Sequence, residues 1–327
     1  MAREIRTFET TFAGRPLSVE TGRTSELANG SCWVRYGETV VMANVTASAK
    51  PREGVDFFPL SVDFEEKLYA VGKIPGSFLK REGRPSEKAT LASRMIDRPI
   101  RPMFPKDMRN DVSVVVTVLS TDIDNSPEIA GFIAASIAIC ISDIPFREPI
   151  AAVNVGLVDG KFVLNPMTAD REKSDLDLTV AGSAEKIVMI EAGANEVPND
   201  VMLDAIALAH EEIKKMVAFI ADIQAQIGKP KFAFVSQEVP HELLDAVLEE
   251  FGDDFKAALD TDDKNVREER LLPIKDAIHE KYDPEYAETQ PTLLDEVIYK
   301  AQKVIVRRWL LDEQKRVDGR GMDEMRP

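Results

Sequence analysis

The sequence contains few residues of the types that build metal centres or disulfide frameworks. Its 327 residues include only two cysteines, Cys32 and Cys140, and three histidines. Both cysteines sit among apolar residues, which predicts small buried side chains rather than a disulfide or a thiolate metal site. The histidines, His210, His241 and His279, show none of the spacings that zinc sites use. We therefore predict no metal ligand in this chain.

Long apolar runs and phosphate-loop motifs are scarce as well. No apolar run approaches the roughly 20 residues needed to cross a bilayer. The longest, residues 129–144, is interrupted by Ser136, Ser142 and Asp143. The first residues lack the apolar segment of a signal peptide. We therefore expect a cytoplasmic protein without a membrane partner. Glycine-rich loops of the P-loop or dinucleotide type are missing too, and Ser31, Ser77 and Ser86 have no histidine near them in sequence.

Charge of one sign predominates. The formal net charge is −16, which taken alone argues against a nucleic-acid partner. The distribution is uneven, however, because residues 66–109 contain 11 basic and five acidic residues, a balance of +6 against −22 for the rest of the chain. An acidic protein with one basic segment can bind a polyanion at that segment and repel it elsewhere.

The pattern of the remaining residues predicts an α+β fold that ends in a helical region. A length of 327 residues fits two or three domains. Strand and helix patterns alternate up to about residue 227, and only helical patterns follow Pro240. The first 65 residues are β-rich as a whole. Predicted strands lie at 31–36, 39–45, 57–64, 111–119, 149–158, 161–164, 176–180 and 187–191. Predicted helices lie at 86–97, 128–142, 199–227, 241–259, 263–282 and 292–315.

Two prolines and one serine refine these predictions. Pro59 cannot donate a hydrogen bond to a neighbouring strand, which predicts that residues 57–64 form an edge strand. Ser86 is a typical N-cap residue and should begin the helix at 86–97. Pro99 should end it, because a residue that precedes proline disfavours the helical conformation.

Residues 72–87 combine glycine breakers, cations and one aromatic side chain. They read Gly-Lys-Ile-Pro-Gly-Ser-Phe-Leu-Lys-Arg-Glu-Gly-Arg-Pro-Ser-Glu, and their glycines and prolines predict a long loop at residues 67–84. Single-stranded nucleic acid is bound by such groups, because cations neutralise phosphates and a flat apolar face stacks on bases. A solvated loop whose Phe78 packs into the core is the alternative that the composition leaves open.

A second group of arginines follows on the predicted helix and just after it. Arg94, Arg98 and Arg101 are spaced by four and three residues, so Arg94 and Arg98 share a helix face. A guanidinium can hold phosphate through two parallel hydrogen bonds, which suits an RNA backbone or inorganic phosphate. Structural ion pairs of Arg98 or Arg101 with Asp97 or Glu87 are the alternative.

Acidic residues elsewhere fit turns better than catalysis. Asp122 and Asp124 flank a turn before a predicted helix. Asp170, Asp175 and Asp177 are expected at solvated strand ends rather than in a metal cluster. These acidic residues are therefore not candidates for acid–base catalysis or for a metal site.

The basic segments also carry a family resemblance. The run from Phe57-Phe58-Pro59-Leu60 through Gly76-Ser77-Phe78 and residues 81–87 to residues 96–102 (Ile-Asp-Arg-Pro-Ile-Arg-Pro) resembles the bacterial polynucleotide phosphorylases, which are polyribonucleotide nucleotidyltransferases. Supporting pieces follow in the family's order at residues 20–22, 165–166, 176–182 and 316–320. The resemblance covers essentially the whole chain.

The resemblance implies a domain order. Family members join two RNase PH-like domains, of the ribosomal protein S5 domain 2-like fold, through an all-helical domain. For this chain it implies two subdomains of a first RNase PH-like domain, a linker, a small all-α domain and the start of a second RNase PH-like domain, at residues 1–145, 146–230, 231–239, 240–315 and 316–327. The family's catalytic residues lie in the second RNase PH-like domain, so we expect this chain alone to be inactive.

The resemblance also implies an activity and partners. Family members form homotrimeric rings and degrade single-stranded RNA from its 3′ end during mRNA turnover. They use inorganic phosphate as co-substrate, release nucleoside diphosphates and require Mg²⁺ or Mn²⁺, whose site is expected outside this chain. This chain would be the RNA-guiding and ring-forming half, with other RNA-degradation proteins as further partners. A scaffold half that never touches RNA is the alternative.

The residues expected at the RNA follow from the same resemblance. The family's channel loop has two aromatic residues followed by two arginines, and Phe78, Leu79, Lys80 and Arg81 occupy those positions here. Leu79 and Lys80 depart from that pattern, so we predict a weaker grip on RNA. The further residues expected beside the RNA path are Arg84, Arg94, Arg98 and Arg101.

Overall fold

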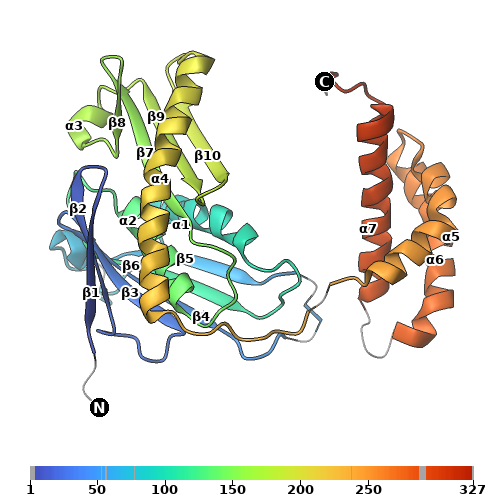
Figure 1. The fold of residues 1–327 in the computed structure, drawn as a ribbon, viewed down its shortest axis with the longest axis horizontal. Helices are drawn as coiled ribbons and strands as arrows, with labels where there is room; N and C mark the ends of the chain where they lie inside the picture. Colours follow the sequence, from blue (N-terminus) through green and yellow to red (C-terminus); the bar gives the residue numbers. More distant parts are fainter. Residues whose placement is uncertain are drawn as a thin grey trace. The chain divides into compact units, whose positions relative to one another are not determined.

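Contacts within the chain divide it into two units, Met1–Val235 and Ser236–Pro327, each with its own hydrophobic core (Figure 1). The structure is a computed structural model that describes residues 4–52, 54–55, 57–76, 78–236, 238–286 and 292–325, apart from the side chain of Glu285. The division falls within the predicted linker at 231–239. Strands and helices share unit 1, whereas unit 2 is helical, so the predicted α+β class is confirmed.

The first sheet of unit 1 follows the alternation of its side chains. In β3, Cys32, Val34 and Tyr36 are buried, while Arg35 between them is exposed, because successive side chains of a strand point to opposite faces. The strand order is β1-β2-β3-β4-β6-β5, and only β5 and β6 are parallel. The bounds are β1 Arg6–Phe12, β2 Arg15–Thr21, β3 Gly30–Tyr36, β4 Thr39–Ala47, β5 Leu60–Glu66 and β6 Val112–Ser120.

Two helices accompany this sheet. A parallel strand pair needs a crossover connection, and α1 (Glu87–Ile100) lies in the connection from β5 to β6. The helix α2 (Pro127–Ile141) packs on β3 and β4 and is buried on nearly all sides. A helix that is apolar all round belongs inside a core. The loop and helix that carry the basic segment are therefore attached to a rigid layer.

The second sheet and a long helix complete unit 1. The strand order is β10-β9-β7-β8, all antiparallel. The helix α4 (Asn199–Ile227) packs against β7, β9 and α2, so that both sheets share one core. The bounds are β7 Ala151–Val158, β8 Lys161–Leu164, α3 Thr168–Arg171, β9 Leu176–Gly182 and β10 Ile187–Ala194.

Arg15 joins the two parts of unit 1 through a polar network. Its Nη1 donates to the carbonyl oxygen of Asp124 at 2.9 Å and to Oδ1 of Asn125 at 2.8 Å. Its Nη2 donates to the carbonyl oxygen of Asn165, in the segment that follows the second sheet's hairpin. The guanidinium also lies 4.9 Å from the ring centroid of Tyr36. Buried polar groups held this way favour a single arrangement of the surrounding backbone.

Lys231, at the start of the predicted linker, is hydrogen-bonded to the core of unit 1. Its Nζ donates to the carbonyl oxygens of Ile139, Cys140 and Ser142 at 3.2, 2.9 and 2.7 Å. These carbonyls lie at the C-terminal end of α2, where the helix dipole favours a cation. Burial lowers the pKa of the Lys231 ammonium, which opposes this arrangement in part. The beginning of the predicted linker is therefore attached to the core of unit 1.

Unit 2 contains three helices with a common core. They are α5 (His241–Leu259), α6 (Lys264–Tyr286) and α7 (Leu293–Arg308), and a π-helical turn, Trp309–Glu313, follows the last. Val247, Phe255, Ile278, Val297 and Ala301 are each completely buried in this core. The predicted helices at 241–259, 263–282 and 292–315 are thus confirmed, with small shifts at their ends.

Most differences from the predicted elements concern their ends. The expectation that Pro99 ends the helix near Asp97 is wrong, because α1 runs to Ile100 and continues as a 3-10 turn, Arg101–Met103. Pro99 lacks only one N–H, and its ring and Ile100 are buried, which stabilises the last turn. The predicted edge strand is confirmed at β5, although it begins at Leu60. The short helix α3 and the bounds of β1 and β2 were not predicted.

Candidate nucleic-acid interface

The long basic loop is closed at its base by side-chain hydrogen bonds. Ser86 Oγ donates to Oε2 of Glu66 at 2.6 Å, and the backbone N–H of Leu68 donates to Oε1 of Glu82 at 3.0 Å. Ser86 also accepts from the N–H of Ala89 at 2.9 Å, which confirms it as the N-cap of α1. Glu66 and Leu68 precede the loop while Glu82 and Ser86 end it. These contacts therefore join the two stems of the loop.

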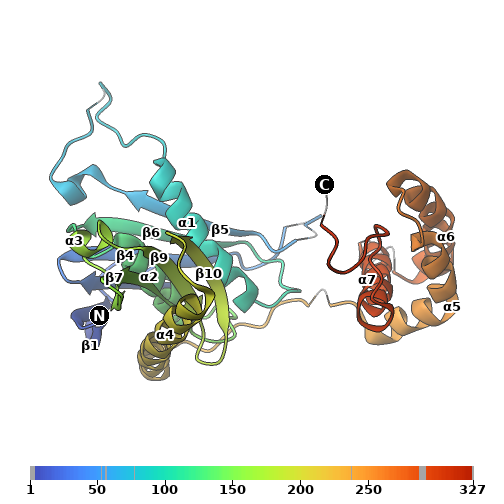
Figure 2. The same ribbon diagram turned by 90° about the horizontal axis from the view of Figure 1, so that it is seen from above.

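The tip of this loop exposes its apolar and basic side chains together. Phe78 is 99% exposed and Leu79 67% exposed. Lys80, Arg81 and Arg84 are exposed as well. Figure 2 shows the loop rising from the body of unit 1 between β5 and α1. The alternative in which Phe78 packs into the core is therefore wrong. Ser77, which belongs to the motif before Phe78, lies outside the described residues.

The loop tip combines a left-handed backbone position with exposed cations. Lys80 has a φ of +50°, a left-handed conformation that a non-glycine residue adopts at some energetic cost. Within the described residues, no ion pair joins Lys80, Arg81 or Arg84 to a carboxylate, whereas Lys67 at the start of the loop contacts Glu65 at 2.6 Å. The tip thus presents cations whose donors are available to an outside anion.

The arginines of α1 line one cavity. Arg94, Arg98 and Arg101 border a hollow of about 630 Å³, together with Met95 and Glu191. Arg94 is exposed. Arg98 approaches Glu191 of β10 at 3.6 Å, and both side chains are more than half exposed, so this pair is weak. Glu191 was not foreseen as a partner, because it is distant from Arg98 in the sequence.

Arg101 is held differently from the other two arginines. Its Nη2 lies 2.8 and 2.9 Å from the two carboxylate oxygens of Asp97, one turn earlier. Its Nη1 donates to the carbonyl oxygen of Phe58 at 3.3 Å and its Nη2 to that of Leu60 at 3.1 Å. The structural alternative, an ion pair with Asp97, is therefore present. Contact of Arg101 with RNA remains a prediction, and its guanidinium joins the end of α1 to the start of β5.

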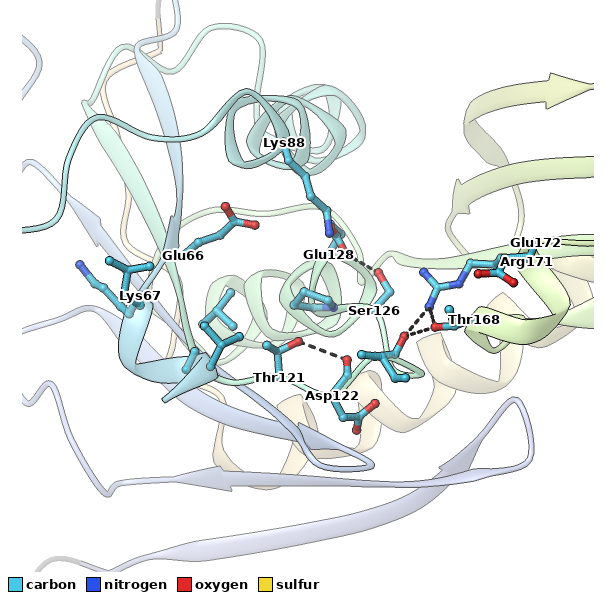
Figure 3. Close-up of a pocket in the computed structure, with 16 residues that line it drawn as sticks. Glu66, Lys67, Lys88, Thr121, Asp122, Ser126, Glu128, Thr168, Arg171 and Glu172 are labelled. Carbon is cyan, nitrogen blue, oxygen red and sulfur yellow. Dashed lines mark hydrogen bonds and ion pairs between the residues drawn. The ribbon is translucent and has the colours of Figure 1, made fainter. Parts of the chain in front are cut away.

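A second cavity lies between the base of the basic loop and the beginning of α2 (Figure 3). It measures about 770 Å³. Lys88 points across it to Glu128 at 2.8 Å, and Arg171 donates to the carbonyl oxygen of Ile123 at 2.7 Å. Burial opposes ionisation of Glu128, but hydrogen bonds from Lys88 and Ser126 outweigh it and lower the pKa of that carboxyl. The cations of this cavity are thus bound by the chain itself.

Other candidate residues take structural positions. Asp122 accepts hydrogen bonds from the backbone N–H groups of Glu38, Asp124 and Asn125 at 2.8–2.9 Å, as turn chemistry predicts. Both cysteines are buried and free. Burial raises the pKa of the Cys140 thiol to about 12. Among the described residues, no group of three or more histidine, cysteine, aspartate or glutamate side chains could hold a metal ion. No chemical step is therefore assigned to a metal bound by these residues.

Residues at the chain's end form a compact turn. Arg320 Nη2 contacts Oδ2 of Asp318 at 2.5 Å, and this hydrogen bond lowers the pKa of that carboxyl to about 2. Gly319 has a φ of +77° and donates its N–H to the carbonyl oxygen of Arg316 at 3.1 Å. A left-handed turn of this kind favours glycine, which gives the 316–320 segment a structural reason for its residue types.

Comparison with known proteins settles the family. The profiles described as "3′ exoribonuclease family, domain 1" and "3′ exoribonuclease family, domain 2" match residues 13–145 and 148–212. The chain belongs to the 3′ exoribonuclease family. A third profile, "Polyribonucleotide nucleotidyltransferase, RNA binding domain", matches residues 242–321 in unit 2. The resemblance to the N-terminal region of polyribonucleotide nucleotidyltransferases, and the RNase PH-like fold that it implied, are confirmed.

Relatives within this 3′ exoribonuclease family are similar along the whole chain. The polyribonucleotide nucleotidyltransferase of Ruminiclostridium cellulolyticum is 53% identical over 98% of this chain, and that of Clostridioides difficile is 52% identical over 99%. Each alignment covers 46% of the relative, so the chain spans about half the length of the curated relatives it matches. The crystal structure of rice (Oryza sativa) Rrp46 matches with 14% identity and a TM-score of 0.49, over 69% of this chain and 94% of that one. That likeness is too weak to add to the assignment.

The helices in the described parts were also compared with the requirements of a membrane span. None of them is long and apolar enough to cross a membrane. The RNA-contacting residues expected from the sequence are tested neither by the relatives nor by the profiles, so their roles remain predictions.

Proposed function

We propose that this chain is the RNA-guiding and ring-forming half of a phosphorolytic 3′-to-5′ exoribonuclease that degrades single-stranded RNA in mRNA turnover. The observation that carries the proposal is the loop tip, where Phe78 is 99% exposed beside Lys80 and Arg81. A single strand can stack a base on the ring while its phosphates meet the cations. A duplex hides its bases, so the same surface would discriminate against it.

The reaction proposed for the whole protein is the transfer of the RNA's terminal nucleotidyl group to inorganic phosphate. An oxygen of inorganic phosphate, the co-substrate, attacks the phosphorus of the 3′-terminal linkage. The bond from that phosphorus to the 3′ oxygen of the preceding nucleotide breaks, which releases a nucleoside diphosphate and leaves a shortened RNA with a 3′ hydroxyl. Catalytic residues and Mg²⁺ or Mn²⁺ would be supplied by a second RNase PH-like domain beyond the residues described here.

The residues of this chain would contribute positioning to that reaction. Fixing a strand near the reacting groups lowers the entropic part of the barrier. Loop-tip residues would bind the entering strand. Arg84, Arg94 and Arg98 would contact its phosphate backbone. Leu79 and Lys80 replace an aromatic and an arginine of the family's pattern, which should weaken the grip. Arg101 would act indirectly, because its guanidinium is bound to Asp97 and the start of β5.

The proposed assembly and location follow the same resemblance. The chain would form a homotrimeric ring in the cytoplasm and meet other RNA-degradation proteins there. One observation favours the rival proposal of a scaffold without RNA contact. The interactions of Arg101 are structural, and Arg98 already has Glu191 within 3.6 Å. The loop tip, where no such pairing occurs among the described residues, is what separates the two proposals.

The decisive experiment compares two triple variants that remove the same kinds of group. Phe78→Ala with Lys80→Ala and Arg81→Ala removes the loop-tip groups. Leu27→Ala with Lys161→Ala and Lys264→Ala removes one fully exposed apolar residue and two exposed cations elsewhere. Fluorescence anisotropy with labelled single-stranded oligoadenylate should show a loss of affinity for the first variant only. Equal affinities would leave the scaffold proposal standing.

Activity is tested in two proteins. Release of nucleoside diphosphates from polyadenylate and inorganic phosphate should be undetectable with this chain alone. In a protein that includes the segments following this chain in its relatives, the loop-tip variant should raise KM for RNA more than it lowers kcat, because it acts on binding. Turnover by the chain alone would contradict the expectation that its catalytic groups lie elsewhere.

A further inference from the structure

The two large cavities of unit 1 share one ion pair. Lys88 and Glu128 border both the cavity of about 630 Å³ that contains the three arginines of α1, here called the arginine cavity, and the second cavity of about 770 Å³. Lys88 Nζ lies 2.8 Å from Oε1 of Glu128. Figure 3 shows Lys88 pointing from α1 across the second cavity to Glu128 at the beginning of α2. The pair therefore lies between the two cavities, and the flexible stem of the lysine allows its ammonium to turn toward either.

The contact holds Lys88 only weakly. The lysine side chain is 67% exposed, and ion pairs with an exposed partner contribute little in water. Lys88 is also the second residue of α1, where the helix dipole disfavours a cation. Within the described residues, Glu128 is its only ion-pair partner. Arg101, by contrast, contacts Asp97 and two backbone carbonyl oxygens at once.

Glu128 does not depend on Lys88 alone. Ser126 Oγ donates a hydrogen bond to its Oε2. The carboxylate also lies in the first turn of α2, where the helix dipole favours an anion. A buried charge that loses its only partner is strongly destabilising. Glu128 would retain a hydroxyl donor and the helix N-terminus, so the departure of Lys88 should cost little.

The arginine cavity offers neighbours to a phosphate group. Arg94 is exposed, and within the described residues no ion pair joins it to a carboxylate. Arg98 has only the long contact to Glu191, at 3.6 Å. Arg94 follows Lys88 by six residues, or about 9 Å along the helix axis at about 1.5 Å per residue. A phosphate that enters beside these arginines therefore approaches the ammonium of Lys88 as well.

We propose that Lys88 is a phosphate-binding residue of the arginine cavity, and that Glu128 holds its ammonium until a phosphate group replaces the carboxylate. The exchange breaks no covalent bond, because one oxygen anion takes the place of another beside the same cation. The phosphate can belong to the backbone of single-stranded RNA or be free inorganic phosphate. The RNA form of the inference rests on the proposed function, and the experiment separates the two sources.

The first measurement is the affinity of the full chain for labelled oligoadenylate in phosphate-free buffer over a series of KCl concentrations. Lys88→Met should lower the slope of log affinity against log salt by about 0.7 and weaken binding by about fivefold near 0.1 M KCl. Glu128→Gln, whose amide oxygen still accepts from Ser126, should strengthen binding by about two- to fivefold, because Lys88 is no longer held. A pair that only joins α1 to α2 predicts no such opposite effects.

The double variant distinguishes competition for Lys88 from the general effect of removing an acidic charge. In the Lys88→Met background, Glu128→Gln should no longer strengthen binding. A gain that persists there would overturn the proposal. Lys214→Met with Glu211→Gln removes a similar exposed pair on α4 and should leave RNA affinity unchanged.

The second measurement is isothermal titration with inorganic phosphate at constant ionic strength and without RNA. An effect of Lys88→Met on oligoadenylate alone identifies the backbone phosphate as the ligand, and an effect on inorganic phosphate alone identifies the free ion. If Lys88→Met changes neither affinity while the loop-tip variant loses RNA binding, the inference fails and the proposed function stands. If Lys88→Met weakens RNA binding and the loop-tip variant does not, Lys88 is supported and the role of the loop is refuted.

Discussion

Two parts of one basic segment use their cations in opposite ways. At the loop tip, Lys80 and Arg81 are exposed beside Phe78, with no carboxylate partner among the described residues. At the end of α1, Arg101 is bound to Asp97 and to backbone carbonyls of Phe58 and Leu60. Both places carry basic side chains of the same segment. Whether a cation can serve an outside ligand depends on whether the fold has already provided it with acceptors.

The comparison extends to a third cation, Lys231, which is not in the basic segment. Its ammonium donates hydrogen bonds to carbonyl oxygens at the end of α2, and the residue is half-buried. Such groups contribute to stability, because removing one partner leaves the others unsatisfied. Substitutions at the loop tip should therefore change RNA binding, while substitutions at Arg101 and Lys231 should change folding.

The largest effect is expected at Phe78. Replacing it by Ala should weaken binding of single-stranded oligoadenylate by about 5- to 150-fold, because a stacked base contributes about 1–3 kcal/mol. The free energy of unfolding should stay within about 0.5 kcal/mol of the parent, as expected for an exposed side chain. Isothermal titration and urea unfolding measure the two quantities. A Phe78→Ala variant that is destabilised but binds RNA with normal affinity would show that Phe78 serves folding rather than RNA binding.

Leu79→Phe tests the same RNA-binding role of the loop tip through an expected gain of affinity. It restores the second aromatic of the family's loop on an exposed position, and should tighten binding by about fivefold or more if the base can reach it. Leu79→Val serves as a control that changes shape without adding a ring. Unchanged affinity in both variants would show that position 79 lies away from the RNA.

Lys231→Met should have the next largest effect. The methionine keeps most of the apolar stem but leaves the carbonyls of Ile139, Cys140 and Ser142 without their common donor. We expect unit 1 to lose about 1.5–3 kcal/mol of stability, the contribution typical of hydrogen bonds to a charged group. Lys229→Met, two residues earlier, is an exposed comparison that removes one hydrogen bond, to the carbonyl oxygen of Asn29, and should cost less. Urea unfolding followed by tryptophan fluorescence gives the values, and equal midpoints would refute the role of the ammonium.

Arg101→Ala should destabilise unit 1 by about 1 kcal/mol, less than Lys231→Met, because the guanidinium is 42% exposed and water can replace part of its contacts. RNA affinity at a temperature where the variant is folded should be unaltered. Arg94→Ala, on the exposed face of the same helix, should be neutral for stability. A fall in RNA affinity without a change in stability would instead assign Arg101 to the RNA path.

His279 should produce the smallest effect, in unit 2. Partial burial opposes its charged form, but Asp283 at 3.1 Å and Asp295 at 3.5 Å outweigh this and raise its pKa. A group whose pKa is raised by folding stabilises the fold fully below its unfolded pKa and loses that contribution as pH rises through the folded value. Unit 2 should therefore lose a few tenths of a kcal/mol to about 1 kcal/mol above neutral pH. Thermal melts of His279→Gln at several pH values should lack this change.

Local sequence signals predicted the parts of the fold that depend on neighbouring residues. Ser86 caps α1 because the N–H that it accepts from is three residues away. The hairpin between β7 and β8 follows from Asp159-Gly160, whose φ values of +49° and +72° suit those residue types. The loop at 67–84 was predicted from its glycines and prolines, although the 3-10 turn at Leu68–Val71 within it was not.

Contacts between distant segments could not be predicted from the sequence. Arg101 lies four residues after Asp97, so their pairing could be foreseen as an alternative. The carbonyl oxygens of Phe58 and Leu60 are about 40 residues away in sequence and come close to Arg101 only in the folded chain. The Arg98–Glu191 pair joins α1, which lies beside the first sheet, to β10 of the second sheet.

The most direct test of the central claim is the salt dependence of oligoadenylate binding by the parent chain and by two variants, Lys80→Ala with Arg81→Ala, and Arg101→Ala. If Lys80 and Arg81 meet phosphates and Arg101 does not, the double variant should lower the slope of log affinity against log salt by about 1.4 and Arg101→Ala should leave it unchanged. Parallel lines for the parent and the double variant, with a shallower line for Arg101→Ala, would contradict the account.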